Sequence, residues 1–160
     1  MDATHGCEHN AGVVGITDDK TRLNVANFLM EFDTDIAPIV GQQITLSASH
    51  QTADVIARID LLAARAKAAF TSKVLGGEVT DCDLIATGQV SGEAHNYLFI
   101  PTESLFQADV KGSAPLSMTD LRKLAITDNN ALTFTCVPPG SGNRMALDRD
   151  LDGTFNRDPL

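Results

Sequence analysis

Apolar residues recur with helical spacing over two segments in the first half of the chain. The first segment runs from Asp18 to Phe32, where hydrophobic side chains form a broad stripe. Thr17 is a candidate N-cap, and Asp18 and Asp19 stand in the first turn, where carboxylates interact favourably with the helix dipole. Pro38 follows shortly afterwards and opposes continuation of the helix. We therefore predict a first helix over this segment.

The second segment carries the most regular amphipathic pattern of the chain. Its hydrophobic residues repeat at intervals of three and four positions, at Val55, Ile56, Ile59, Leu62, Ala63, Ala66 and Phe70. Such spacing predicts a helix with one buried face. Ser47, Ser49 or Thr52 is the candidate cap, and Gly76 and Gly77 are expected to end the helix. The short β-branched run before it, Ile39 to Leu46, predicts an extended segment or a partly buried linker.

Short β patterns dominate the second half of the chain. Glycines and a proline separate three such runs, at 83–90, 96–100 and 105–109, which predicts a meander of antiparallel strands. Ser117 or Thr119 is then expected to cap a short helix, and a last strand is predicted from Leu132 to Val137. Two prolines follow this strand, and the segment after them, Gly140-Ser141-Gly142, is interpreted as a flexible connection.

This order of elements predicts an α+β fold in which helices pack on a small antiparallel sheet. The chain has 160 residues, 43% of them hydrophobic, which is enough for one sizeable core. We therefore expect one α+β domain over residues 1–147 and a C-terminal loop over 148–160 that packs on the same domain. No run of about 18 apolar residues is present, so no membrane span is predicted.

The net charge argues against a nucleic-acid partner. The chain carries a formal charge of −9, and its 12 lysines and arginines do not cluster. Nucleic-acid-binding surfaces are basic patches that neutralise phosphates. We therefore expect a protein partner or self-assembly.

The run from Asp148 to Asp158 is the only stretch whose residue types and spacing together specify a chemistry. Aspartates stand at loop positions 1, 3 and 5, and glycine stands at position 6: Asp148, Asp150, Asp152 and Gly153. Calcium takes six to eight oxygen ligands at about 2.3–2.6 Å, so a short loop must turn sharply to direct several side chains at one point. Alternating aspartates also repel one another unless a cation is present. A calcium site is therefore predicted.

Three later residues are candidates to complete this site. Thr154 at position 7 offers a backbone carbonyl, and Asn156 at position 9 ligates directly or through water. Position 12 is Pro159 rather than the bidentate glutamate of an EF-hand, so Asp158 is expected to close the shell one residue early. A solvated acidic tail that binds no ion is the alternative interpretation.

The loop resembles the aspartate-rich calcium loops of dockerin and thrombospondin type 3 repeats, which begin D-x-[DN]-x-D-G. Together with the segments 28–43 and 133–142, it also makes the chain similar to the C-terminal region of large exported bacterial proteins, some with β-propeller or cytochrome-like regions upstream. The resemblance implies export and calcium, and it supplies no catalytic residue. The haem-attachment motif C-x-x-C-H is absent from the chain.

The cysteines favour an exported protein. Cys82 and Cys136 both lie in predicted strands, and neighbouring strands bring such residues within bridging distance, which predicts one disulfide. Two buried free thiols are the alternative. Cys7 lies between His5 and His9, and the three residues are a candidate site for zinc or copper. An irregular terminus without a ligand is the alternative interpretation. Cys7 is also a candidate for an intermolecular disulfide.

The remaining polar and aromatic residues do not form a recognised catalytic motif. Alternate positions of one predicted strand place three side chains on the same sheet face: His95, Tyr97 and Phe99. They are interpreted either as core residues or as a ligand-binding surface. Asp81 and Asp83 are expected on a solvated strand face. The sequence thus favours a calcium-stabilised, secreted, cell-surface or periplasmic structural or interaction module without catalytic activity. A self-assembling filament subunit, or a hydrolase or redox enzyme with a histidine-containing site, is the alternative.

Overall fold

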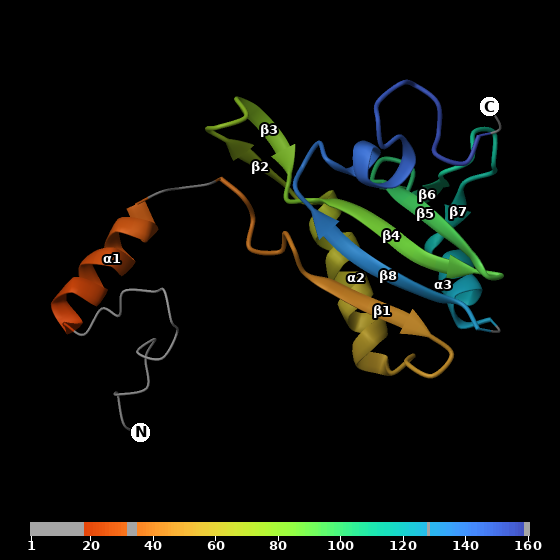
Figure 1. Cartoon of the computed structure of the whole chain (residues 1–160), viewed down its shortest axis with the longest axis horizontal. Helices are drawn as coiled ribbons and strands as arrows, with labels where there is room; N and C mark the ends of the chain where they lie inside the picture. The colour runs from red at the N-terminus through yellow and green to blue at the C-terminus, as the bar shows by residue number, and fades with distance from the viewer. Residues whose placement is uncertain (1–17, 32–34, 128, 159–160) are drawn as a thin grey trace, which may run out of the picture. The chain divides into compact units, whose positions relative to one another are not determined.

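The computed structural model describes residues 18–31, 35–127 and 129–158 of the chain. Contacts divide the chain into two units, Met1–Thr34 and Asp35–Leu160, and each is described by itself. The candidate metal residues at His5, Cys7 and His9, and the candidate cap Thr17, lie outside the described residues. Figure 1 labels the helices and strands along the chain.

The first unit contains helix α1 (Asp19–Glu31), close to the predicted bounds. The carboxylate of Asp18 accepts hydrogen bonds from the Thr21 amide at 2.7 Å and from the Thr21 hydroxyl at 2.6 Å. These bonds stabilise the charged carboxylate and lower the pKa of Asp18. Asp18 thus satisfies a free amide of the first turn, as an N-capping side chain does.

The second unit is built on a six-stranded antiparallel sheet, so the predicted α+β class is confirmed. The strand order is β1-β8-β4-β5-β6-β7. The strands are β1 (Gln43–Ser47), β4 (Asp83–Val90), β5 (Glu93–Ile100), β6 (Leu105–Ala108), β7 (Leu116–Ser117) and β8 (Ala131–Val137). Helices α2 (Ala53–Lys67) and α3 (Met118–Ile126) lie on one side of this sheet (Figure 1).

Side-chain alternation along the strands separates two apolar clusters, one on each face of the sheet. In β4, Leu84 and Ala86 belong to the large core under the helices, whereas Ile85 between them belongs to a small cluster on the other face. In β5, Phe99 joins the large core and Leu98 packs in the small cluster. This two-residue period is the direct consequence of strand geometry. The small cluster is the platform on which the C-terminal loop rests.

Two predicted caps are confirmed at the helices of the second unit. The Thr52 hydroxyl accepts a hydrogen bond from the Val55 amide at 3.4 Å, at the start of α2. The Ser117 hydroxyl accepts from the Asp120 amide at 3.1 Å, at the start of α3. Each hydroxyl satisfies an amide that the first helical turn leaves without a partner.

The predicted end of the second helix is wrong. Helix α2 ends at Lys67, and Phe70 instead pairs with Val79 in a separate two-stranded hairpin of β2 (Ala69–Ser72) and β3 (Gly77–Thr80). Phe70 follows Ala66 by four residues, so its position mimics a further helical turn although Ala68 already has extended backbone angles. Gly76 and Gly77 form the hairpin turn with positive φ angles rather than a helix end.

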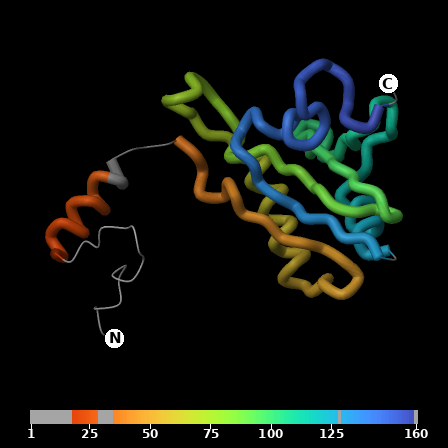
Figure 2. Tube along the Cα trace, viewed as in Figure 1, coloured from red at the N-terminus to blue at the C-terminus, as the bar shows by residue number. Residues whose placement is uncertain are grey.

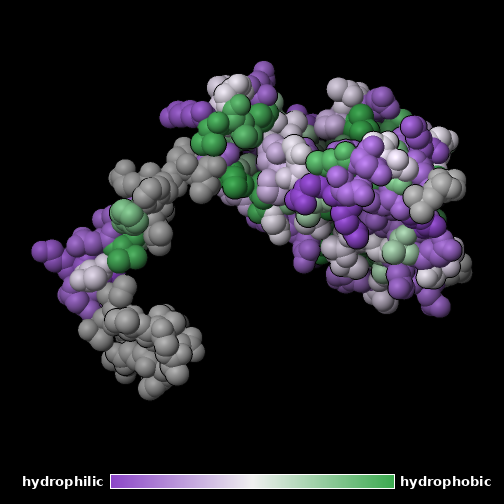
Figure 3. All heavy atoms as spheres, turned by 45° about the horizontal axis from the view of Figure 1, so that its top comes forward, coloured by the Kyte–Doolittle hydropathy of each residue, from purple (hydrophilic) through white to green (hydrophobic). Residues whose placement is uncertain are grey.

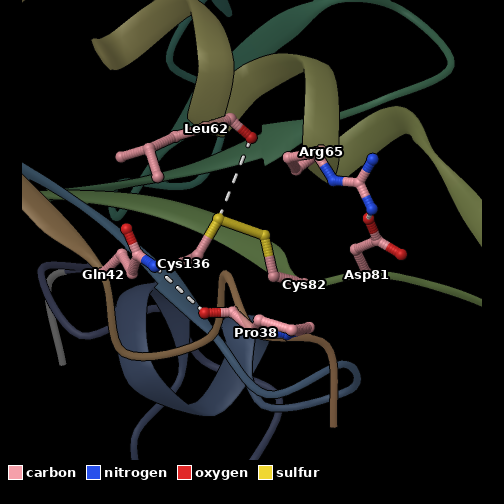
Figure 4. Close-up of a disulfide and its surroundings, with 7 residues drawn as sticks. All are labelled: Pro38, Gln42, Leu62, Arg65, Asp81, Cys82 and Cys136. Carbon is pink, nitrogen blue, oxygen red and sulfur yellow. Dashed lines mark hydrogen bonds and ion pairs between the residues drawn. A yellow bond between two sulfur atoms is a disulfide. The ribbon is translucent and has the colours of Figure 1, made fainter.

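The Cys82 and Cys136 sulfur atoms lie at disulfide distance, as the sequence predicts (Figure 4). Cys136 belongs to β8 and Cys82 directly precedes β4, its neighbour, so the two Cα atoms are 5.4 Å apart. Both cysteines are completely buried beneath α2. The bond joins positions 54 residues apart in the sequence.

Asp81 does not lie on a solvated strand face, which corrects the sequence-based expectation. It is 3% exposed and forms an ion pair with Arg65 of α2, whose side chain reaches down beside the disulfide (Figure 4). Asp83 is half-buried, and its carboxylate accepts a hydrogen bond from the Gly142 amide at 2.8 Å. Each carboxylate thus has a partner within the fold.

Among the described residues, no helix combines the length and the apolar character needed to cross a bilayer.

Candidate metal centre

A short helical turn, whose last two residues are buried, leads into the C-terminal loop. The turn η1 (Asn143–Leu147) has π-helical hydrogen bonding, and its Ala146 and Leu147 pack against Ile85 and Val137 of the sheet. Gly142 precedes the turn and lies so close to the sheet that a Cβ atom on it would be 2.6 Å from the Leu98 side chain. Gly142 therefore packs tightly against the sheet, whereas Gly140 of the predicted flexible connection is exposed.

The loop from Asp148 to Asp158 is closed at its base by main-chain and apolar contacts. The Asn156 amide donates to the Leu147 carbonyl at 2.7 Å, and Phe155 packs on the same small cluster as Leu147. Figure 2 traces this segment in dark blue as it leaves the sheet and returns to it. A loop anchored at both ends holds its side chains in one arrangement.

The structure brings Asp148, Asp150 and Asp152 together, as the sequence predicts. One carboxylate oxygen from each lies within 4.8 Å of the others. Gly153 follows with φ of 88°, the left-handed conformation that glycine adopts without strain, and it turns the chain back after the third aspartate. Three carboxylates held at this separation match the ligand type and the spacing that a hard divalent cation requires.

Asp148 is the buried member of the three. Its residue is 5% exposed, and its Oδ2 accepts a hydrogen bond from the Gly153 amide at 2.9 Å. Its Oδ1 is buried and has no hydrogen-bond partner among the described residues. A buried carboxylate oxygen without a partner is costly, so a cation bound to it would remove a substantial desolvation penalty. Asp150 and Asp152 are exposed.

Thr154, Asn156 and Asp158 hold the loop by hydrogen bonds. The Thr154 amide donates to Asp152 Oδ1 at 2.7 Å. Asn156 spans the base of the loop, since its Oδ1 accepts from the Arg149 amide at 3.0 Å and its Nδ2 donates to the Ala146 carbonyl at 3.3 Å.

Both carboxylate oxygens of Asp158 accept hydrogen bonds from backbone amides. Oδ1 accepts from Lys111 at 2.6 Å, and Oδ2 accepts from Phe155 at 3.2 Å. In the described part of the chain, the close carboxylate cluster consists of Asp148, Asp150 and Asp152. In this arrangement Asp158 fixes the end of the loop to the connection between β6 and β7.

Arg157 adds a second anchor that the sequence does not reveal. Its guanidinium pairs with Glu93 and donates to the Ala94 carbonyl at 2.9 Å and to His95 Nε2 at 2.7 Å. Because arginine only donates, His95 Nε2 is the acceptor in this contact. The hydrogen bond from Arg157, and after it the arginine charge, lower the pKa of Glu93. These partners are more than 60 positions away along the chain, so no pattern of neighbouring residues in the sequence indicates the contacts.

His95 lies between this anchor and a buried aspartate. Its Nδ1 lies 3.9 Å from Oδ1 of Asp109, which is completely buried. The other oxygen of Asp109 accepts from the amide and the side chain of Asn96, at 3.1 and 2.9 Å. The Asp109 carbonyl in turn accepts from the Arg157 amide at 3.1 Å. The loop end and the β5 strand are thereby joined through one polar network.

The remaining sequence-based candidates belong to the core or to turns. Tyr97 and Phe99 are 3% and 4% exposed, so they do not present a ligand-binding face. Burial and the nearby Asp109 charge raise the pKa of Tyr97. His50 bonds through Nδ1 to the Thr45 carbonyl at 2.9 Å. Among the described residues, neither His50 nor His95 forms a hydrogen bond with a hydroxyl or thiol that would serve as a nucleophile.

Comparisons of the chain with protein-family models, curated proteins and solved structures find no match.

Proposed function

We propose that this chain is an exported structural or interaction module whose C-terminal loop binds one calcium ion. Asp148, Asp150 and Asp152 supply the carboxylates, and the Thr154 carbonyl supplies a further oxygen. The observation that carries the proposal is Asp148, which belongs to a cluster of carboxylates within 4.8 Å and whose buried Oδ1 has no hydrogen-bond partner among the described residues. Calcium offsets both the desolvation of this oxygen and the mutual repulsion of the three charges.

The role of the ion in this proposal is to stabilise the fold. The loop rests on the small apolar cluster and is tied to β5 and to the β6–β7 connection by Arg157 and Asp158. An ion that binds only the folded loop adds its binding free energy to the stability of that packing. The loop has no glutamate at position 12, so it lacks the ligand through which an EF-hand changes its helix angle. We therefore propose that calcium stabilises the domain and does not switch its conformation.

Export is supported by two features together. The Cys82–Cys136 pair is at disulfide distance, and such bonds persist mainly in oxidising compartments. A calcium loop with incomplete protein ligation also needs the high calcium concentrations found outside cells. The resemblance of the sequence to the C-terminal region of large exported bacterial proteins agrees with this location.

Thermal unfolding with calcium and with a chelator tests the stabilising role. Calcium at 100 times its Kd should add about 2.7 kcal/mol to the unfolding free energy. The Asp150→Ala variant should lose most of the calcium-dependent shift in the unfolding midpoint. Glu103→Ala is the matched control, because it removes an exposed carboxylate outside the loop. Equal midpoints for the unmodified chain in calcium and in chelator would refute the proposal.

A further inference from the structure

We propose that His95 is a pH-sensitive switch at the point where Arg157 anchors the C-terminal loop to β5. The unprotonated imidazole accepts a hydrogen bond from Arg157, and the protonated imidazole releases Arg157 and pairs with the buried carboxylate of Asp109. The proton comes from solvent and adds to Nε2. The switch acts on the attachment of the loop and does not depend on whether the loop binds calcium.

The contact between Arg157 and His95 exists only while Nε2 has a free lone pair. Nη1 of Arg157 lies 2.7 Å from this nitrogen, and it also donates to the Ala94 carbonyl at 2.9 Å. A protonated imidazole carries an N–H group on both ring nitrogens and has no acceptor. Protonation therefore sets two cationic N–H donors against each other, and the guanidinium must move away from the ring.

The buried carboxylate of Asp109 offers the protonated imidazole a partner. Its Oδ2 accepts from the amide and the side chain of Asn96, whereas its Oδ1 has no hydrogen-bond partner in the described part of the chain. His95 Nδ1 lies 3.9 Å from this Oδ1. An imidazolium that moves toward Oδ1 supplies both the missing hydrogen-bond donor and a charge of opposite sign.

The surroundings of the imidazole contain few groups that can titrate. The titratable and charged groups that face it come from β5, from the residue after β6 and from the loop: Glu93, Tyr97, Asp109 and Arg157. On β4, the residue opposite His95 is Gly88, which does not titrate. The hydrogen bond from Arg157 lowers the pKa of Glu93, and burial raises the pKa of Tyr97, so neither group changes its charge between pH 8 and pH 5. An imidazole ordinarily takes up its proton near pH 6.5, within this window.

Solvent reaches the imidazole in the folded protein. The His95 side chain is 22% exposed. Figure 3 turns the upper part of Figure 1, where the C-terminal loop lies, toward the viewer and shows a largely hydrophilic face with small, separate hydrophobic patches. Proton uptake at this position therefore needs no unfolding.

Release of the guanidinium weakens the anchor without detaching the loop. Arg157 keeps its ion pair with Glu93, and the Asp158 carboxylate still accepts from the Lys111 amide. The guanidinium loses one of its contacts on β5 and gains freedom of motion. Mild acid thus loosens the attachment of the loop end before the carboxylates of the fold titrate.

Nuclear magnetic resonance of the full chain in a chelator, between pH 8 and pH 5, tests the switch. Long-range proton–nitrogen correlations identify which imidazole nitrogens are protonated. His95 should carry its proton on Nδ1 alone at pH 8 and should be protonated on both nitrogens at pH 5. The Arg157 Nε–H signal should shift with the same midpoint, and its order parameter should fall. His50 is the internal control, because its Nδ1 bonds to the Thr45 carbonyl rather than to Arg157.

Two variants separate the two halves of the switch. His95→Gln keeps a side-chain oxygen that can accept from Arg157 but does not titrate, so the Arg157 signal should stay constant from pH 8 to pH 5. Asp109→Asn keeps an acceptor for the Asn96 donors and removes the charge, so His95 should take up its proton at a lower pH than in the unmodified chain.

Four results would overturn the proposal. The first two are a proton on Nε2 at pH 8 and a His95 imidazole that is still unprotonated at pH 5. The third is a complete titration of His95 that leaves the Arg157 signal unchanged, or an equal shift of that signal in His95→Gln. The fourth is an unchanged His95 midpoint in Asp109→Asn, which would exclude Asp109 as the partner of the protonated ring.

Discussion

The carboxylate of Asp158 accepts a hydrogen bond from the backbone amide of Lys111 at 2.6 Å and thereby ties the end of the acidic loop to the β6–β7 connection. The residue that the sequence offers as a late metal ligand thus has a structural contact 47 positions away. One aspartate, Asp158, fixes the end of the loop, whereas three others gather at the candidate site. Substitutions can therefore test the anchoring of the loop and the binding of an ion separately.

Replacement of Asp158 by alanine should destabilise the protein even without calcium. The change leaves the Lys111 and Phe155 amides without their acceptor, at a cost of about 1–3 kcal/mol for each amide that water does not reach. Urea unfolding in a chelator measures this loss. Asp152→Ala is the comparison, because its exposed carboxylate should matter mainly when calcium is present. A destabilisation by Asp158→Ala that appears only with calcium would show that Asp158 is a ligand rather than an anchor.

The Cys82–Cys136 bond should contribute about 2–5 kcal/mol to stability, because it closes a long loop in the unfolded chain. Thiol titration of the denatured, unreduced protein should find one free thiol, which belongs to Cys7. Replacement of both cysteines by alanine should lower the urea midpoint, and the Cys7→Ala variant is the control that removes a thiol but not the bond. Three reactive thiols in the unreduced protein would contradict this assignment.

The ion pair between Glu93 and Arg157 should make stability fall in acid. The pKa of Glu93 is lowered from 4.5 in the folded protein, chiefly by its hydrogen bond with Arg157. The pair therefore contributes its full stabilisation above pH 4.5 and loses it as the pH falls through the lower folded pKa. The difference in unfolding free energy between the unmodified chain and Glu93→Gln should shrink over that window. A difference that stays constant down to pH 2 would exclude this titration as its source.

Calcium should slow amide exchange close to the loop only. The amides of Arg149, Gly153 and Thr154 bond to side chains within the loop, and that of Lys111 bonds to Asp158, so all four should gain protection when the ion fixes the loop. Amides of α2 and β1 should exchange at the same rate with calcium and with chelator. A change in α2 would indicate a rearrangement at a distance and favour a sensor over a stabilising module.

The regular elements follow from local patterns that the sequence displays. The caps at Thr52 and Ser117, the two-residue alternation in β4 and β8, and the turn at Gly153 each depend on residues a few positions apart. The three-aspartate cluster is predictable for the same reason, because a loop of this kind turns its own side chains toward one point. Local physics thus accounts for β1, β4, β5, β6 and β8, for the helices and for the acidic cluster.

The features that the sequence does not reveal depend on contacts between distant positions. Phe70 fits the helical period of α2, and only its pairing with Val79 shows that it belongs to a hairpin. Asp81 alternates with Asp83 as a solvated strand residue would, yet Arg65 of α2 allows its burial. Arg157 likewise contacts distant residues, Ala94 and His95 of β5. Tertiary contacts decide such cases, and no alternation or spacing encodes them.

Calcium titration by isothermal calorimetry tests the central claim most directly. The chain should bind one calcium ion, and Asp148→Asn should abolish most of that binding, because the substitution keeps the size of the buried side chain and removes the charge that the ion neutralises. Glu103→Gln, which changes an exposed carboxylate outside the loop, should bind calcium like the unmodified chain. Absence of calcium binding by the unmodified chain, or equal binding by Asp148→Asn, would contradict the account.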